Sequence, residues 1–413
     1  MPGERPLSHL NTACCDISGY VTERLGPRLV TINPSGRFLY VANWESDDVS
    51  AYTSDRTTGA LAQVAGSPFA AGARPRAVTI EPTGRFAYVA NWESDDLSAY
   101  AIDPTTGALT PVPGSPFASG AHPRNVRVDP AGRFAYVGNR DSHTISAYMI
   151  NADSGALTPV PGSPFVTSAR PRTVVVDPTG LFAFAAHEDS DRFSAYRIDP
   201  ITGALTPLEG SPFPAGKDPR SVTIHPNGQL MFVANQGSQS VSVYELRSAA
   251  EALVSVAGSP FRAEKRPFAV LIEPSGRFAY VANQGSNTIS AYAIQASGRL
   301  LPLDGSPVAA GTHPIWPTVD PSGRFLYVAN IRSHDVSAYA IHPGLGTLIP
   351  VAGSPFPAGK SPRGVTVDPS GRFVFLANEQ SDTVSAYAIT PQTGALAPVP
   401  GSPFPAGRIQ GCA

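Results

Sequence analysis

Short hydrophobic segments alternate with clusters of proline, glycine, serine and aspartate along almost the whole chain. Between Pro75 and Gly120 four such segments occur: AVTI (77–80), FAYVAN (86–91), LSAYAI (97–102) and ALTPV (108–112). Alternating or β-branched runs of this length, bounded by turn-forming residues, predict β-strands. Helical periodicity is absent. The proline in the fourth segment places that strand at the edge of a sheet, because proline cannot donate a ladder hydrogen bond.

The same unit recurs eight times. The phrase PSGRFLYVAN begins at Pro34, and versions of it follow every 48 residues, or 47 once, at Pro82, Pro130, Pro178, Pro226, Pro274, Pro321 and Pro369. Four strands per unit, with a proline-tolerant outer strand, are typical of a β-propeller blade. The first and last units are ordinary, whereas an open solenoid needs atypical capping units at its ends.

The sequence therefore predicts an all-β fold, a β-propeller of eight four-stranded blades, with a seven-bladed ring as the alternative. The repeats define one domain over residues 27–409, between an N-terminal extension (1–26) and a C-terminal tail (410–413). Two explanations of ring closure stay open. Either the last blade packs directly on the first, or the segment ISGYVTERLG (17–26) adds a strand at the seam.

Composition mainly excludes classes of function. The chain has 30 basic and 32 acidic side chains and a net charge of −2, so no charge excess is available for counterion release and no nucleic-acid partner is expected. Three cysteines, Cys14, Cys15 and Cys412, cannot form a disulfide framework for a chain of this size. No apolar run reaches the ~18 residues of a membrane span, and no signal peptide is visible. We therefore expect a soluble, cytoplasmic protein with no membrane partner.

Motifs for bound groups are also absent. The sequence contains no zinc-ligand spacing, calcium loop, phosphate-binding loop, dinucleotide fingerprint or nucleophile elbow. We expect no cofactor and no metal.

The repeated residues resemble a known family. YVAN, VSAY, TGAL and the P-x-G-R turn, which together cover about nine tenths of the chain, resemble the YVTN-repeat and lactonase-family β-propellers, which include 6-phosphogluconolactonases. The resemblance implies a lactone hydrolase that uses histidine, arginine and glutamate from a P-R-H loop and from an Asn-Glu pair after the second strand. No repeat here contains P-R-H, and the Asn-Glu pair survives only as Asn378-Glu379.

Two sets of loops are expected to share one face of the propeller, and departures from the repeat mark that face. One set, G-x-x-P-R, leads into the inner strand and carries an arginine in six repeats; the other follows VAN and is the most variable position set in the chain. Variable loops over a rigid scaffold commonly carry binding specificity. A ring of arginines favours a small anionic ligand, although each arginine could instead pair with an acid of a neighbouring blade.

These observations lead to two hypotheses. The first is a lactonase-like enzyme that acts on a small anionic lactone or sugar acid, with His187 or His122 as general base and Glu188, Arg172 and Arg124 around it. His187 has a structural explanation too, as a substitute for the asparagine of the other repeats. The second is a non-catalytic propeller that binds a small molecule, a glycan or a protein partner. The ligand-binding candidates are Arg28, Arg76, Arg220, Arg363, Trp44, Glu45, Trp92, Glu93, His122, Arg140, Asp141, Phe268, His313, Trp316, Arg332 and Glu379.

Overall fold

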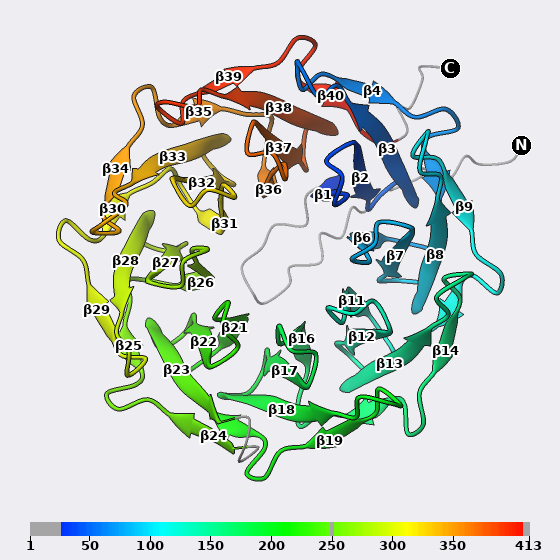
Figure 1. The fold of residues 1–413 in the computed structure, drawn as a ribbon, viewed down its shortest axis with the longest axis horizontal. Helices are drawn as coiled ribbons and strands as arrows, with labels where there is room; N and C mark the ends of the chain where they lie inside the picture. The colour runs from blue at the N-terminus through cyan, green and yellow to red at the C-terminus, as the bar shows by residue number, and fades with distance from the viewer. Residues whose placement is uncertain (1–25, 248–251, 408–413) are drawn as a thin grey trace, which may run out of the picture.

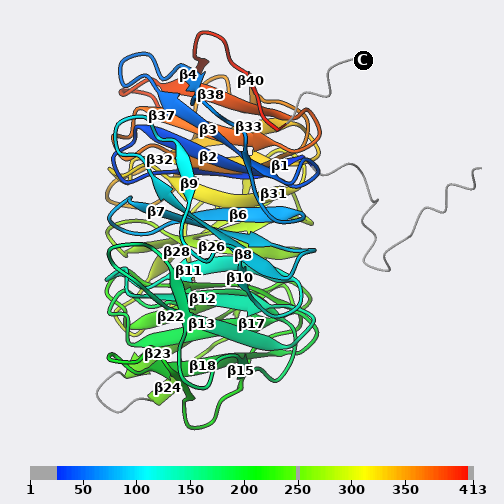
Figure 2. The ribbon, with the colours of Figure 1, turned by 90° about the vertical axis from the view of Figure 1, so that its right-hand side faces the viewer.

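In the computed structural model the eight repeats form a closed ring of eight β-sheets (Figure 1). The structure describes residues 26–247 and 252–407. Seen edge-on, the molecule is a flat disc whose strands cross its thickness (Figure 2). The predicted all-β propeller with eight four-stranded blades is confirmed, and the seven-bladed alternative does not hold.

Each blade begins with two strands, of which the first lies next to the axis. The innermost strands start at the proline of the loop, which is tolerated as the first residue of a strand. They are β1 (Pro27–Ile32), β6 (Pro75–Ile80), β11 (Pro123–Val128), β16 (Pro171–Val176), β21 (Pro219–Ile224), β26 (Pro267–Ile272), β31 (Pro314–Val319) and β36 (Pro362–Val367). The second strands are β2 (Phe38–Asn43), β7 (Phe86–Asn91), β12 (Phe134–Asn139), β17 (Phe182–His187), β22 (Leu230–Asn235), β27 (Phe278–Asn283), β32 (Phe325–Asn330) and β37 (Phe373–Asn378). These second strands are almost entirely buried between neighbouring blades, which explains their continuous apolar sequence.

The third strand of each blade pairs with the second along its whole length. These strands are β3 (Asp48–Ser54), β8 (Asp96–Ile102), β13 (Thr144–Ile150), β18 (Arg192–Ile198), β23 (Ser240–Arg247), β28 (Thr288–Ile294), β33 (Asp335–Ile341) and β38 (Thr383–Ile389). Their other edge carries the outer strand, as the edge position of the fourth segment predicted.

The outer strand is split into two short pieces, which the sequence did not predict. The first pieces are β4 (Leu61–Gln63), β9 (Leu109–Pro111), β14 (Leu157–Pro159), β19 (Leu205–Pro207), β24 (Ala252–Ser255), β29 (Leu300–Pro302), β34 (Leu348–Pro350) and β39 (Leu396–Pro398). The second pieces are β5 (Phe69–Ala70), β10 (Phe117–Ala118), β15 (Phe165–Val166), β20 (Phe213–Pro214), β25 (Phe261–Arg262), β30 (Val308–Ala309), β35 (Phe356–Pro357) and β40 (Phe404–Pro405). In the first blade both pieces pair with β3, at its two ends. Between them the hydroxyl of Ser67 accepts the amide hydrogen of Ala51, at 2.9 Å, so the serine replaces a strand carbonyl.

Neighbouring blades are joined by contacts that recur in several of the repeats. The hydroxyl of Tyr40 donates a hydrogen bond to the carbonyl of Gly107 in the next blade, at 2.9 Å, and the ring of Phe38 lies against the same glycine. Nearer the axis, the hydroxyl of Thr31 donates to the carbonyl of Val78, at 2.7 Å. Each blade face is thus buried against the next, and the hydrophobic clusters span pairs of blades.

The ring closes by packing of the eighth blade on the first. Val30 and Leu39 share one hydrophobic cluster with Phe375, and the amide of Gly407 donates to the hydroxyl of Ser50, at 2.9 Å. Among the described residues, the first and last sheets contain strands of their own repeat alone. The candidate closing segment 17–26 lies, apart from Gly26, outside the described residues.

Candidate functional site

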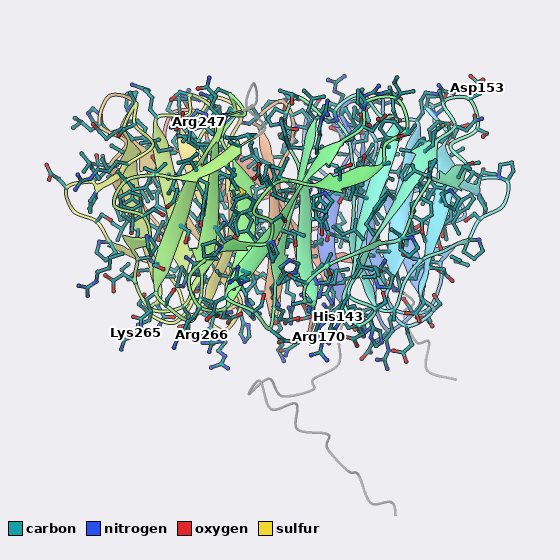
Figure 3. All side chains as sticks on the ribbon, turned by 90° about the horizontal axis from the view of Figure 1, so that it is seen from below. His143, Asp153, Arg170, Arg247, Lys265 and Arg266 are labelled. Carbon is teal, nitrogen blue, oxygen red and sulfur yellow. The ribbon has the colours of Figure 1, made fainter. Side chains whose placement is uncertain are left out.

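The two variable loop sets lie on one face of the disc, which we call the variable face. Figure 3 shows His143, Arg170, Lys265 and Arg266, which belong to these loops, on one side, and Asp153 and Arg247 on the opposite side. Six arginines occupy the second position of the innermost strands, so they surround the axis near this face. We call this set the arginine ring: Arg28, Arg76, Arg124, Arg172, Arg220 and Arg363.

Glu188 connects several blades of the arginine ring. Its Oε1 lies 2.7 Å from Nη1 of Arg172 and 3.7 Å from Nη1 of Arg220, and its Oε2 lies 3.2 Å from Nη2 of Arg124. A further guanidinium, that of Arg140, donates from Nε to Oε2 at 2.8 Å. Burial opposes ionisation of this carboxyl, but the surrounding guanidiniums outweigh it and lower the pKa of Glu188 to about 2. Glu188 is therefore an ionised carboxylate of low basicity.

Glu379 plays a similar part between the eighth and first blades. Its carboxylate accepts a hydrogen bond from Nε of Arg363, at 2.5 Å, and lies 3.8 Å from Nε of Arg28. Its side chain is almost fully buried. Burial, followed by the charge of Arg363, lowers the pKa of Arg28 to about 9. The predicted pairing of arginines with acids of other blades is therefore seen at both glutamates.

Arg76 differs from the other members of the ring. None of the ion pairs among the described residues involves it, and its guanidinium lies 5.0 Å from the ring centre of Trp92. Burial, and then the charges of four other guanidiniums, lower its pKa. The ring therefore has more positive than negative charge on the side of the second blade.

Aromatic side chains pack on the cationic part of the face. Trp44 is buried, with the guanidinium of Arg28 4.1 Å from its ring centre. Trp92 stacks on His122 with ring centres 4.6 Å apart and planes at 18°. These contacts agree with cation–π pairing of arginine and tryptophan, so both tryptophans brace the arginines.

The sixth and seventh blades give the face an apolar sector. Phe268 and Ile315 stand where the other blades have arginine, and both are buried in one small cluster. Trp316 packs edge-on against Phe268 with ring centres 5.2 Å apart and is 37% exposed. A bulge in β31 at this point gives the backbone of Trp316 a φ of 34°, a value that residues other than glycine rarely adopt.

The remaining candidates lie farther out on the loops. Glu93 pairs with Arg74 at 3.4 Å, and both side chains are about half exposed. Nδ1 of His122 lies 2.6 Å from Oδ2 of Asp141, and Oδ1 of the same carboxylate accepts a bond from Nη1 of Arg140 at 2.8 Å. Three more residues, all at least partly exposed, lie on these loops: Glu45, His313 and Arg332.

His187 is enclosed within its blade. The side chain has no exposed surface, its Nδ1 lies 3.1 Å from the carbonyl oxygen of Ala169, and its Nε2 lies 2.7 Å from the hydroxyl of Ser194. Asn91 makes the equivalent bond to Ser98, at 2.9 Å. The geometry matches the structural explanation of His187 and gives the imidazole no route to a ligand. Glu188, Arg124 and Arg172 are brought together; His187 does not join them.

Replacing His187 with asparagine is expected to remove a pH dependence of stability. Burial lowers the pKa of His187 to about 4, whereas the unfolded side chain titrates near its ordinary value of 6.5. As the pH falls below 6.5 the unfolded chain binds the proton first, so stability that is present above this pH is lost towards pH 4. The loss reaches about 2 kcal/mol at pH 5.

Urea unfolding at neutral pH and at pH 5 measures this effect. The wild type should lose more stability between the two conditions than His187→Asn. Equal losses in the two proteins would show that the imidazole titrates normally in the folded state.

Sequence reasoning, directed at the loops, did not single out Arg127. It is the one charged residue at its position among the eight repeats, where β1 and β6 carry Thr31 and Thr79. The two threonines donate to inner-strand carbonyls of the next blade, at 2.7 and 2.8 Å. The side chain of Arg127 is exposed. Comparison of the repeats position by position would have found it.

The described residues contain no group of three or more histidine, cysteine or acidic side chains arranged to hold a metal ion. Within the same ranges, no helix has the length and hydrophobicity that a membrane span requires.

Comparisons with known proteins agree with this architecture. The family described as "Lactonase, 7-bladed beta-propeller" matches in overlapping stretches at residues 16–72, 29–119, 64–169, 115–213, 212–357 and 354–408. No curated protein matches the sequence. The chain has one blade more than the family description states.

Solved structures show the same fold at low sequence identity. A candidate 6-phosphogluconolactonase from Bacteroides uniformis aligns with a TM-score of 0.60 and 19% identity, over 92% of this chain and 96% of that one. The periplasmic gluconolactonase of Pseudomonas aeruginosa aligns with a TM-score of 0.57 and 22% identity, over 92% and 97%. Sqt1 from Chaetomium thermophilum aligns with a TM-score of 0.64 and 12% identity, over 88% and 94%. Neighbours of such different kinds establish the fold alone.

Proposed function

The chain belongs to the lactonase family of β-propellers, and from this premise we propose that it acts on a small anionic lactone or sugar acid held by the arginine ring. The charge of the ring is the observation that carries the proposal. Glu188 and Glu379 pair with five of the six guanidiniums, and Arg76 forms none of the described ion pairs. Guanidiniums in such surroundings bind carboxylate and phosphate oxygens.

Unsatisfied polar atoms beside the ring support a polar ligand. Nε of Arg28, Nε of Arg124, Oδ1 of Asn125 and Oγ1 of Thr173 are buried and have no hydrogen-bond partner among the described residues. Buried polar groups rarely remain without partners in folded proteins. A ligand that carries several oxygens would supply them.

The proposed reaction is attack of water on the lactone carbonyl. The guanidiniums of Arg76, Arg124 and Arg172 stabilise the negative charge that develops on the carbonyl oxygen. The ring C–O bond then breaks, and the proton released by the water reaches the departing ring oxygen through solvent. Glu188 accepts a hydrogen bond from the water and orients it, since its low pKa makes it a weak base. His187 has no part in this scheme.

The test is the rate of ring opening of glucono-δ-lactone and its 6-phosphate above the spontaneous rate. Arg76→Gln is expected to lower kcat/KM by about 100-fold, the usual effect of losing one donor to the oxyanion. Arg74→Gln, which removes an exposed arginine of the same blade, should leave the rate unchanged. A wild-type rate equal to the spontaneous one would refute catalysis on these lactones.

One observation favours the second function, non-catalytic binding of a small anion. Glu188 and Glu379 are both engaged by guanidiniums, and the imidazole of His187 is enclosed. Binding of gluconate without turnover of its lactone, measured by thermal shift, would support a binding protein. A cytoplasmic location remains a prediction, and one structural neighbour is periplasmic.

A further inference from the structure

A contact between a basic and an acidic side chain recurs on the variable face in the second, third and fourth blades. A basic residue in the loop before the inner strand pairs with an acid 19 residues later. The pairs are Arg74–Glu93 at 3.4 Å, His122–Asp141 at 2.6 Å and Arg170–Asp189 at 2.9 Å. The repeat therefore places a basic and an acidic side chain side by side at this point of the face.

The backbone around this pair is the same in the sixth blade. In the second blade the amide of Glu93 donates to the carbonyl of Ala73, at 3.1 Å, and in the sixth the amide of Gly285 donates to that of Lys265, at 2.9 Å. The two loops are therefore held in the same register. Side chains at equivalent positions occupy equivalent space in the two blades.

The sixth blade keeps the cation and lacks the acid. Arg266 stands at the position of Arg74, but its expected partner is Gly285. None of the ion pairs between side chains in the described ranges involves Arg266 or Lys265. The fifth blade also has a glycine at this position, Gly237, so two neighbouring blades lack the side chain that fills the space elsewhere.

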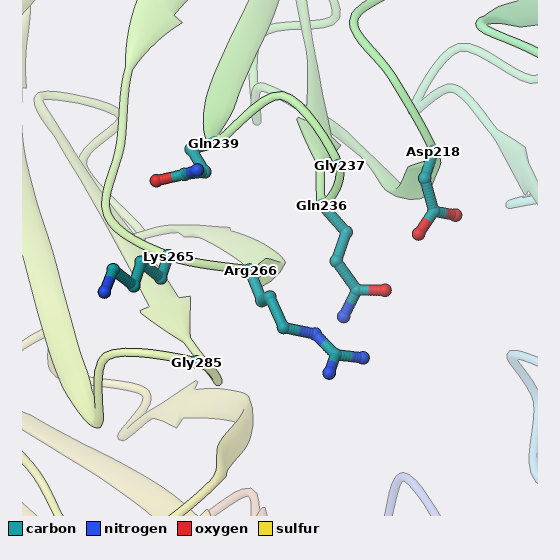
Figure 4. Close-up of a pocket in the computed structure, with 7 residues that line it drawn as sticks. All are labelled: Asp218, Gln236, Gly237, Gln239, Lys265, Arg266 and Gly285. Carbon is teal, nitrogen blue, oxygen red and sulfur yellow. The ribbon is translucent and has the colours of Figure 1, made fainter. Parts of the chain in front are cut away.

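A pocket of about 390 Å³ occupies the space left by the two glycines. Its lining comprises Asp218, Gln236, Gly237, Gln239, Lys265, Arg266 and Gly285 (Figure 4). The side chains of Gln236 and Arg266 point towards one another, whereas Lys265 extends away from them (Figure 4). The amide of Gln236 is held by a bond to Oε1 of Gln284, at 3.2 Å. The pocket thus presents a guanidinium beside a fixed amide, with further hydroxyl-binding groups at Asp218 and Gln239.

We propose that this pocket binds an anionic polyol, a sugar acid or a sugar phosphate, whose carboxylate or phosphate takes the place of the missing acid at Arg266. The amides and Asp218 bind the hydroxyl groups of the same ligand. The proposal goes beyond the function proposed above and does not depend on it, because the pocket shares no residue with the arginine ring.

The sharpest variant restores the side chain that the other blades have. Gly285→Asp is expected to form the ion pair with Arg266 and to exclude the ligand. The backbone of Gly285 does not have a positive φ. A Cβ there would lie 3.0 Å from Cγ of Arg266 and 3.0 Å from the carbonyl oxygen of Lys265, so the side chain and the loop must each shift by a few tenths of an ångström. Gly285→Ala is the matched control, since it adds the Cβ without the charge. Arg266→Ala removes the cation directly, and Arg74→Ala removes an arginine that is already paired.

Binding is measured by the chemical-shift change of the Gly237 amide during titration with D-glucuronate, glucose 6-phosphate or inorganic phosphate. We expect a saturable change in the wild type. The affinity obtained from it should be at least about tenfold lower in Gly285→Asp and in Arg266→Ala. Gly285→Ala, Arg74→Ala and Arg76→Gln should retain the wild-type affinity. The response to glucuronate against glucose 6-phosphate distinguishes carboxylate from phosphate as the recognised group.

Three outcomes would overturn the proposal. The first is a chemical-shift change of the Gly237 amide that persists with unchanged affinity in Gly285→Asp. The second is the absence of any such change in the wild type. The third is an equal response to inorganic phosphate and to the sugars, which would indicate an adventitious ion only. Loss of binding in Arg76→Gln with retention in Gly285→Asp would place the ligand in the arginine ring instead. That result would leave the proposed function standing while removing this second site.

Discussion

Replacing Glu188 with glutamine is expected to destabilise the protein by about 3–5 kcal/mol, because it leaves partly buried positive charges without their counterion. The carboxylate, 17% exposed, contacts Arg124, Arg172 and Arg140 directly. Glutamine has nearly the same shape but cannot neutralise three guanidiniums. The comparison by urea unfolding is with Glu93→Gln, since Glu93 forms an exposed pair with Arg74 and its loss should cost well under about 1 kcal/mol.

The same carboxylate gives this prediction a pH dependence. The pKa of Glu188 is about 2 in the folded protein, against an ordinary value of 4.5. The stability that it contributes is therefore present above pH 4.5 and is lost as the pH falls towards 2. Glu188→Gln should lose less stability than the wild type over this window. A variant as stable as the wild type at neutral pH would show that the three arginines do not need the charge.

Gly107→Ala is expected to destabilise the protein by about 3–4 kcal/mol, through backbone conformation and overpacking together. Gly107 has a φ of 78°, and a Cβ there would lie 2.3 Å from Cδ1 of Phe38 in the preceding blade. Phe38 is buried and cannot move away without disturbing the contact between the two blades. The carbonyl of the same glycine accepts the hydrogen bond of Tyr40.

Gly305→Ala separates the two contributions. Gly305 has a nearly identical φ of 76°, but no atom lies within 4 Å of its Cβ position. Its substitution should therefore cost about 1–2 kcal/mol, the conformational part alone. Equal losses for the two variants in thermal and urea unfolding would mean that the contact between Gly107 and Phe38 contributes nothing.

The propeller could be predicted because the same pattern of strands and turns occurs in each of the eight repeats. The split outer strand could not, because the two-residue piece Phe69–Ala70 is too short to show alternation. It exists because the hydroxyl of Ser67 takes over a backbone hydrogen bond between the two pieces. Such a local substitution has no signature in hydrophobic periodicity.

The sequence identified several residues of the candidate site, but it did not predict which of them contact one another. The arginines and Glu188 were found from departures between repeats, and the structure brings them together. Several arginines from different blades contact the same glutamate, Glu188. Which arginines reach it depends on the distances between blades, and these cannot be derived from the sequence of a single repeat. Gly237 and Gly285 were overlooked as site residues because they have no side chain of their own to bind a ligand and line the pocket only with their backbone. An absent side chain becomes visible only when the ion pairs of the other blades are known.

In the part of the chain that the structure describes, the first and last blades share no strand, and this has a consequence at the level of the gene. Each blade consists of strands from one continuous stretch of sequence. Across the seam, the last blade contacts the first through packing and through hydrogen bonds such as that from Gly407 to Ser50, and the two do not exchange a described strand. An in-frame duplication or deletion of one repeat therefore adds or removes a whole blade and breaks no strand in two. Blade number can change in a single genetic step, and this protein, with one blade more than its family's description, has the architecture on which such a step can act.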